Sequence, residues 1–116
     1  MKYENIEIQN ALESLKTGMI EYIELGAPEY SEKDVEECMN LIDIFLQDIA
    51  LSENKENGMK IVEKLVIQLN DLNEKCDHTL IETDQRERIA DIIILAGHLK
   101  GYNEREEDIS EEWREW

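Results

Sequence analysis

The stretch YSEKDVEECMNLIDIFLQDIAL, residues 30–51, carries the strongest helix-start signal and the clearest amphipathic pattern in the sequence. Ser31 suits the N-cap of a helix, and Asp34 stands three residues later, where its carboxylate can complete a capping box. Tyr30 and Val35 are spaced to form a hydrophobic staple across that start. Apolar residues then recur every three or four positions: Val35, Cys38, Met39, Ile42, Phe45, Leu46 and Ile49. We therefore predict an amphipathic helix that ends near Leu51.

Three further segments show the same helical period. Their inward-facing residues are Ile8, Leu12, Leu15, Met19, Tyr22 and Ile23; then Met59, Val62, Leu65, Val66, Leu69 and Leu72; and last Ile89, Ile92, Ile93, Ala96 and Leu99. The run Ile92–Leu95 could also be a buried strand, because a short apolar run does not distinguish the two. The charged residues 84–88 before it and the continued pattern up to Leu99 favour a helix.

Short connections separate these segments. They are Gly26-Ala27-Pro28, the polar stretch Ser52–Gly58, and Cys76–Glu82, in which we expect Leu80 and Ile81 to be buried. Thr83 could cap the last helix, and Gly101 is a suitable stop. Because short links join antiparallel neighbours, we expect an all-α fold. It is a single domain, residues 1–116, that forms an antiparallel bundle of four main helices with a short C-terminal helix.

The short C-terminal helix is expected within residues 102–116, an acidic segment that holds both tryptophans. Ile109, Trp113 and Trp116 are spaced four and three residues apart, as on one helix face, and Asp108 or Ser110 could cap that helix. Two interpretations of the tryptophans stay open. They can fold back and close the bundle, or they can anchor a binding partner within an acidic rim.

Charge limits the classes of function. The sequence has 29 Asp and Glu against 12 Lys and Arg, a formal net charge of -17. Like charges at this density repel one another and oppose the compact state, so a protein that carries them is expected either to need high solubility or to bind a positively charged partner. Direct binding to nucleic acid is disfavoured, because phosphate contacts require Lys and Arg. The N-terminus does not resemble a signal peptide, and Cys38 and Cys76 fit buried thiols in a reducing compartment, so we expect a cytoplasmic protein with no membrane association.

Two dense groups of acids are the candidate partner-binding residues. The first choice comprises Glu104, Glu106, Glu107, Asp108, Glu111 and Glu112, together with Trp113. The second choice comprises Glu32, Asp34, Glu36 and Glu37, with Glu29 just before them. The simpler interpretation of both groups is an ordinary solvated helix face.

Catalytic and metal-binding patterns are weak. Acidic pairs such as Glu21 with Glu24 are typical of metal-dependent pyrophosphatases, but a chain this acidic produces such pairs by chance. His78 and His98 stand in no zinc or di-iron spacing, and the inward helix stripes are almost purely apolar. We therefore expect no enzyme activity, no metal and no cofactor.

In overall character the chain resembles the small, acidic, all-helical immunity proteins of bacterial polymorphic and contact-dependent toxin systems. The stretches that suggest this are Leu80–Glu87 and Asp108–Trp116, the latter ending in E-E-W-R-E-W. The resemblance implies a protein that binds and neutralises a cognate basic toxin domain, commonly a nuclease. Two alternatives stay open: a nucleic-acid mimic of the anti-restriction or anti-CRISPR type, and, with less support, a nucleotide pyrophosphatase.

Overall fold

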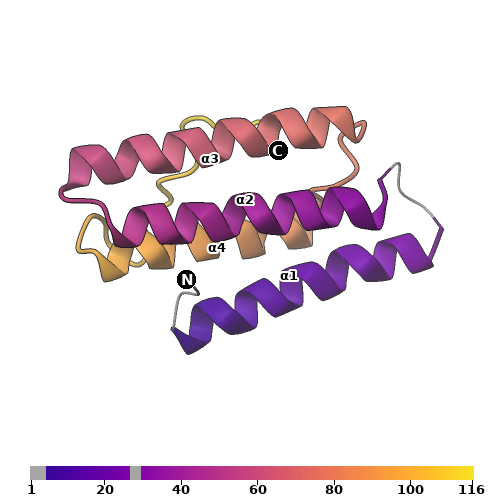
Figure 1. The fold of residues 1–116 in the computed structure, drawn as a ribbon, viewed down its shortest axis with the longest axis horizontal. Coiled ribbons are helices and arrows are strands. Elements are labelled where there is room, and N and C mark those ends of the chain that lie inside the picture. Colours follow the sequence, from indigo (N-terminus) through magenta and orange to yellow (C-terminus); the bar gives the residue numbers. More distant parts are fainter. Residues whose placement is uncertain (1–4, 27–29) are drawn as a thin grey trace.

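The described part of the chain forms four α-helices. The structure, a computed structural model, describes residues 5–26 and 30–116. The helices are α1 (Ile6–Glu24), α2 (Glu32–Ala50), α3 (Lys55–Lys75) and α4 (Thr83–Leu99). Successive helices run in opposite directions, so the all-α antiparallel bundle is confirmed (Figure 1). None of the helices within the described ranges is long and apolar enough to cross a membrane.

The capping signals around Ser31 act as the sequence predicts. The Asp34 carboxylate accepts a hydrogen bond from the Ser31 backbone N–H at 3.0 Å, which is the reciprocal half of a capping box. Tyr30 and Val35 are both buried, as expected of a hydrophobic staple. The Tyr30 hydroxyl donates to the Met19 carbonyl at 2.7 Å and so fixes the start of α2 against α1.

Two helix starts differ from expectation. Asn54 caps α3, because its side chain accepts from the Asn57 N–H at 2.8 Å. That helix therefore begins inside the stretch expected to be a link, and Gly58 is a buried helical residue. Thr83 is the first residue of α4 rather than its cap. The expected ends near Gly26 and Gly101 are confirmed, and both glycines have positive φ; Ala27 and Pro28 lie outside the described residues.

The core is continuous and apolar. Leu80 and Ile81 are buried in it as predicted, and Ile92–Leu95 is helical. Cys38 and Cys76 are both free and buried at one end of the α2–α3 pair. Burial raises the pKa of Cys38 to about 12 and that of Cys76 to about 11, so both thiols stay protonated and unreactive at neutral pH.

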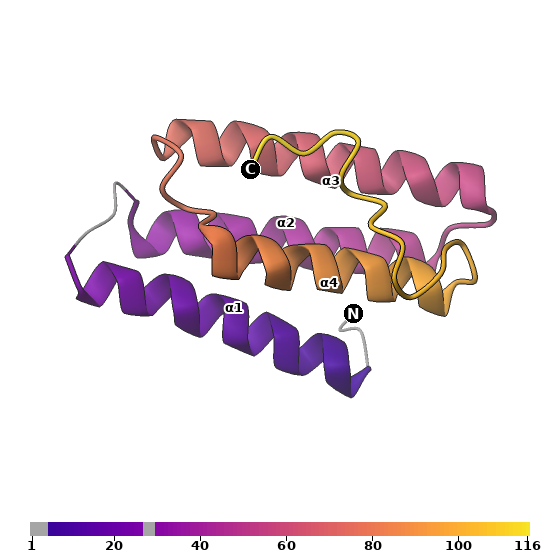
Figure 2. The same ribbon diagram turned by 180° about the vertical axis from the view of Figure 1, so that it is seen from behind.

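The expected short C-terminal helix is wrong. Residues 102–116 follow a course of turns that leaves α4 and crosses toward α3, shown in yellow in Figure 2. The segment does not form a helix because side chains satisfy its backbone groups instead. Asp108 accepts a hydrogen bond from the Ser110 N–H, and the Asn70 side chain, distant in sequence, bonds the Trp113 carbonyl and the Glu115 N–H. We call residues 102–116 the C-terminal strip.

The C-terminal strip links α3 and α4, whose backbones rarely come close to each other in the described part of the chain. Within the described residues, α1 packs on α4 and on α2, and α2 packs on α3, but α3 and α4 make little direct backbone contact. Tyr102 lies against Gly58 of α3, and Asn103 lies against Gly97 of α4, where any side chain would collide with them. Each glycine therefore serves a close approach of the strip to a helix.

We expect Gly58→Ala to destabilise the protein by about 1–3 kcal/mol, because its new methyl group would overlap the Tyr102 ring. In an open helical position the same change would stabilise by up to about 1 kcal/mol, so the sign is diagnostic. Urea denaturation measures the difference. Lys64→Ala, at an exposed position of the same helix, is the control and should stay within about 0.5 kcal/mol of wild type. A stabilised Gly58→Ala variant would contradict the close contact.

Candidate functional site

The C-terminal strip is anchored firmly at its start. The Tyr102 hydroxyl lies 2.7 Å from the Ser52 Oγ, and both residues are buried. The Asn103 side-chain amide donates to the Ile94 carbonyl at 3.1 Å, which is within α4. These contacts hold the strip to the loop before α3 and to the last turns of α4.

Asn70 of α3 fixes the far end. Its Nδ2 donates to the Trp113 carbonyl at 2.8 Å, and its Oδ1 accepts from the Glu115 N–H at 3.0 Å. One side chain thus satisfies two backbone groups more than 40 positions away in sequence. The segment that carries most of the candidate acids is consequently an ordered part of the surface.

Both tryptophans pack against the core. Trp113, Trp116 and Ile109 are partly buried against the core, so the interpretation that the tryptophans close the bundle is the one the structure supports. The Arg114 guanidinium stands 5.4 Å from the centre of a Trp116 ring, in cation–π geometry. The Trp116 Nε1 is buried and finds no acceptor among the described residues. Trp113 is half-buried: it packs against the core, and only the remaining exposed part of its side chain is open to a partner.

Asp108 is turned into the strip. Its carboxylate accepts from the Ser110 Oγ at 2.6 Å, from the Ser110 N–H at 3.0 Å and from Arg114 Nη1 at 2.8 Å. Partial burial opposes ionisation, but the hydrogen bonds from Ser110 and the charge of Arg114 outweigh it and lower the pKa of Asp108. Of the predicted acids in the strip, Asp108 is the one whose carboxylate stabilises the turn through its bonds to Ser110 and Arg114.

The remaining acids of the strip face solvent. They are Glu104, Glu106, Glu107, Glu111 and Glu112, with Glu115 beyond them. The two arginines of the strip form their ion pairs with other carboxylates: Arg105 pairs with Asp91 of α4 at 2.9 Å and with Glu7 of α1 at 3.7 Å, and Arg114 pairs with Asp108. The outward surface of the strip is therefore acidic without a matching cation of its own.

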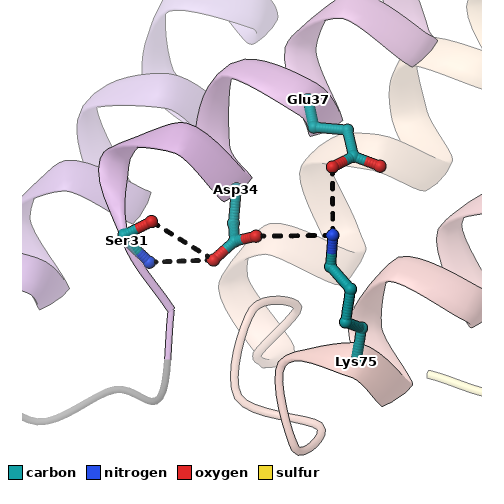
Figure 3. A network of polar contacts seen from close by, with 4 residues as sticks. All are labelled: Ser31, Asp34, Glu37 and Lys75. Atoms are coloured by element: carbon teal, nitrogen blue, oxygen red, sulfur yellow. Dashed lines mark hydrogen bonds and ion pairs between the residues drawn. The ribbon is translucent and has the colours of Figure 1, made fainter.

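The second acidic group is partly neutralised (Figure 3). Lys75 of α3 reaches Glu37 at 3.2 Å and Asp34 at 3.8 Å, and Asp34 also caps α2. The hydrogen bond to Glu37 raises the pKa of Lys75. Glu32 and Glu36 are exposed and form no ion pair with another described residue, and Glu29 lies outside the described residues.

The two acidic groups begin at different ends of the bundle. The second group lies at the start of α2, whereas the strip leaves α4 at the other end and then runs back along α3 (Figures 1 and 2). Asn70, which holds the end of the strip, and Lys75, which pairs with Glu37 of the second group, are both in the later part of α3, so the end of the strip lies toward the same end of the bundle as the second group. The strip is the better candidate, because its acids are the less neutralised.

The interior offers no carboxylate in the described part of the chain. Its buried polar residues are Ser52, Asn73, Gln85, Asn103 and Ser110. The same part holds no group of three His, Cys, Asp or Glu residues arranged to bind a metal ion. His98 is exposed, and its Nδ1 contacts the Asn103 carbonyl at 3.0 Å.

Sequence reasoning missed a polar hollow of about 570 Å³ between α1 and the start of α4. Its only signal in the sequence is the small outward-facing set Ser14, Thr17 and Gly18 of the first helix.

Comparison with protein-family models, curated proteins and solved structures gave no match to this chain. Its function must be argued from these surfaces themselves.

We expect Asn70→Ala to release the end of the strip and to cost about 1–3 kcal/mol, because it removes the partner of two backbone groups. Tryptophan emission should shift to longer wavelength as Trp113 and Trp116 become more exposed. Asn40→Ala, at an exposed position of α2, is the control. An unchanged emission maximum would contradict the role of Asn70.

Asp108→Asn should destabilise the protein at pH 6, and its difference from wild type should shrink as the pH falls. The folded-state pKa of Asp108 lies below the unfolded value, so its contribution is present above about pH 4 and is lost on further acidification. Urea denaturation of both proteins at pH 6 and pH 3 measures this. A difference that is constant with pH would show that the charge of Asp108 contributes nothing.

Proposed function

We propose that this protein is a non-catalytic inhibitor of the immunity type, which binds a cognate basic toxin domain in the cytoplasm and covers its active or substrate-binding surface. A nuclease is the expected class of toxin. The observation that carries the proposal is the C-terminal strip, an ordered row of outward carboxylates whose own arginines are engaged elsewhere.

Charge placed in this way serves association. A basic domain approaches a surface of uncompensated carboxylates faster than a neutral one, and wrong acidic partners are repelled. Because the strip is anchored through Tyr102 and Asn70, its backbone loses little conformational entropy when the strip meets a partner. A nuclease surface evolved to bind phosphate is well suited to such a row of carboxylates.

The composition of the core supports a binding role over a catalytic one. Nucleotide hydrolases of the all-helical type place carboxylates inward to hold metal ions, whereas the buried polar groups described here are amides and hydroxyls. The charge of -17 likewise favours a protein partner over DNA or RNA.

Affinity capture from the native cells at low salt, followed by a salt gradient, tests the proposal directly. We expect one basic protein domain to stay bound through moderate salt, and its activity to be inhibited stoichiometrically by this protein. Capture of a restriction, CRISPR or nucleoid protein would support nucleic-acid mimicry instead. Failure to retain any basic protein would contradict the proposal.

With the partner in hand, Glu106→Lys/Glu111→Lys should slow association at least about tenfold at low salt and flatten its salt dependence. Both positions are exposed, so the fold should be unaffected. Glu32→Lys/Glu36→Lys is the matched control, with the same change of charge in the other acidic group, on α2. Equal effects of the two variants, measured by stopped flow, would show that net charge acts without a defined surface.

A further inference from the structure

The last part of the C-terminal strip is held less firmly than the part before it. Tyr102, Asn103 and Ser110 are buried, whereas every residue from 111 to 116 is exposed or only partly buried. The start of the strip is held by the Tyr102 and Asn103 side chains, which bond to the loop before α3 and to α4. Residues 111–116 instead lie beside α3 (Figure 2). We call residues 111–116 the strap.

One side chain provides the polar attachment of the strap to the helices. Among the described residues, Asn70 alone bonds it to a helix, through the Trp113 carbonyl and the Glu115 N–H. The hydrogen bonds of Arg114 reach Asp108 and Ser110, so they stay within the strip. Breaking the bonds of Asn70 therefore leaves only apolar contacts between the strap and the core.

The closed strap contains groups that oppose closure. The Trp116 Nε1 is buried and has no acceptor among the described residues. A buried donor without an acceptor costs free energy, which is recovered when the group reaches water. The strap also carries Glu111, Glu112 and Glu115, and opening moves them away from a protein of net charge -17. Both effects favour opening, whereas the core contacts of Trp113 and Trp116 favour closure.

The side chains of the strap are suited to binding cations. The Arg114 guanidinium stands 5.4 Å from the centre of a Trp116 ring, so the closed strap already contains one cation–π pair. An arginine or lysine of a partner can pair in the same way with the rings of Trp113 and Trp116 once they leave the core. The three glutamates beside the tryptophans in sequence attract the same cation.

We propose that the strap opens from α3 and presents Trp113 and Trp116 to arginine or lysine side chains of the basic partner, and that Asn70 holds it closed. The closed state predominates in the free protein, so both tryptophans belong to the core there. The open state is a minor one that a cationic partner selects, because only this state frees the tryptophan rings. The identity of the partner rests on the proposed function, whereas the opening itself does not.

Hydrogen exchange of the free protein at increasing urea concentration tests the opening. The Glu115 N–H reports on the strap, since it bonds to Asn70. The Tyr102 N–H bonds to the Gly97 carbonyl at 3.0 Å and reports on the start of the strip. We expect the protection factor of Glu115 to be at least about tenfold lower than that of Tyr102 and to be insensitive to urea. Equal protection and equal urea dependence would show one cooperative unit and overturn the strap.

Tetra-arginine is the probe for the open state, and a ¹⁵N-resolved NMR titration at low salt is the measurement. We expect it to shift the indole N–H signals of Trp113 and Trp116. Asn70→Ala should strengthen its binding about threefold or more, because this variant raises the population of the open strap. Asn40→Ala, at an exposed position of α2, is the control and should stay within about twofold of wild type. Unchanged or weaker binding by Asn70→Ala would overturn the proposal.

Failure of the strap is distinguishable from failure of the inhibitor proposal. Tetra-arginine shifts confined to the backbone amides of Glu104, Glu106 and Glu107 would overturn the strap and leave the proposed function intact. Shifts of both indole signals and stronger binding by Asn70→Ala, with no basic protein retained in affinity capture, would support the strap and contradict the inhibitor function.

Discussion

The attachment of the C-terminal strip to Gly58 and Gly97 is the constraint on which the rest of the structure depends. The backbones of α3 and α4 rarely come close to each other in the described part of the chain, and Tyr102 and Asn103 bridge the two helices by packing against Gly58 and Gly97. Two glycines make this possible, because only a helix surface without a side chain lets the strip approach so closely. The strip consequently packs against the core with its apolar side chains and presents acidic side chains to solvent.

This double role explains the opposite orientations of its side chains. The apolar groups of Ile109, Trp113 and Trp116 pack inward, and Arg114 and Asp108 satisfy each other within the turn. The glutamates between them are left pointing to solvent. A surface built in this way is ordered before it meets a partner, and its order is obtained from the same contacts that stabilise the fold. Substitutions that loosen the strip therefore affect stability and binding together.

The helices were predictable from the sequence because their period and caps are local signals. Ser31 with Asp34, and Gly101 after α4, act at the positions where the pattern places them. The strip was not predictable, since Ile109, Trp113 and Trp116 also have helical spacing, and the group that fixes the backbone in another course is Asn70, which is distant in sequence. The hollow between α1 and α4 was missed for the same reason, because the groups that approach Gly18 come from α4, which is distant in sequence.

The net charge of -17 connects stability with the proposed binding. Carboxylates spread over a small bundle repel one another, and this repulsion is a standing cost of the folded state that the apolar core must offset. A cationic partner relieves the repulsion where it binds, and any ligand that binds only the folded state stabilises it further by mass action. The exposed glutamates of the strip form no ion pair with another described residue, so the strip is a place where such relief is expected to be large. A protein that carries this charge on an ordered surface is therefore expected to be most stable in its complex.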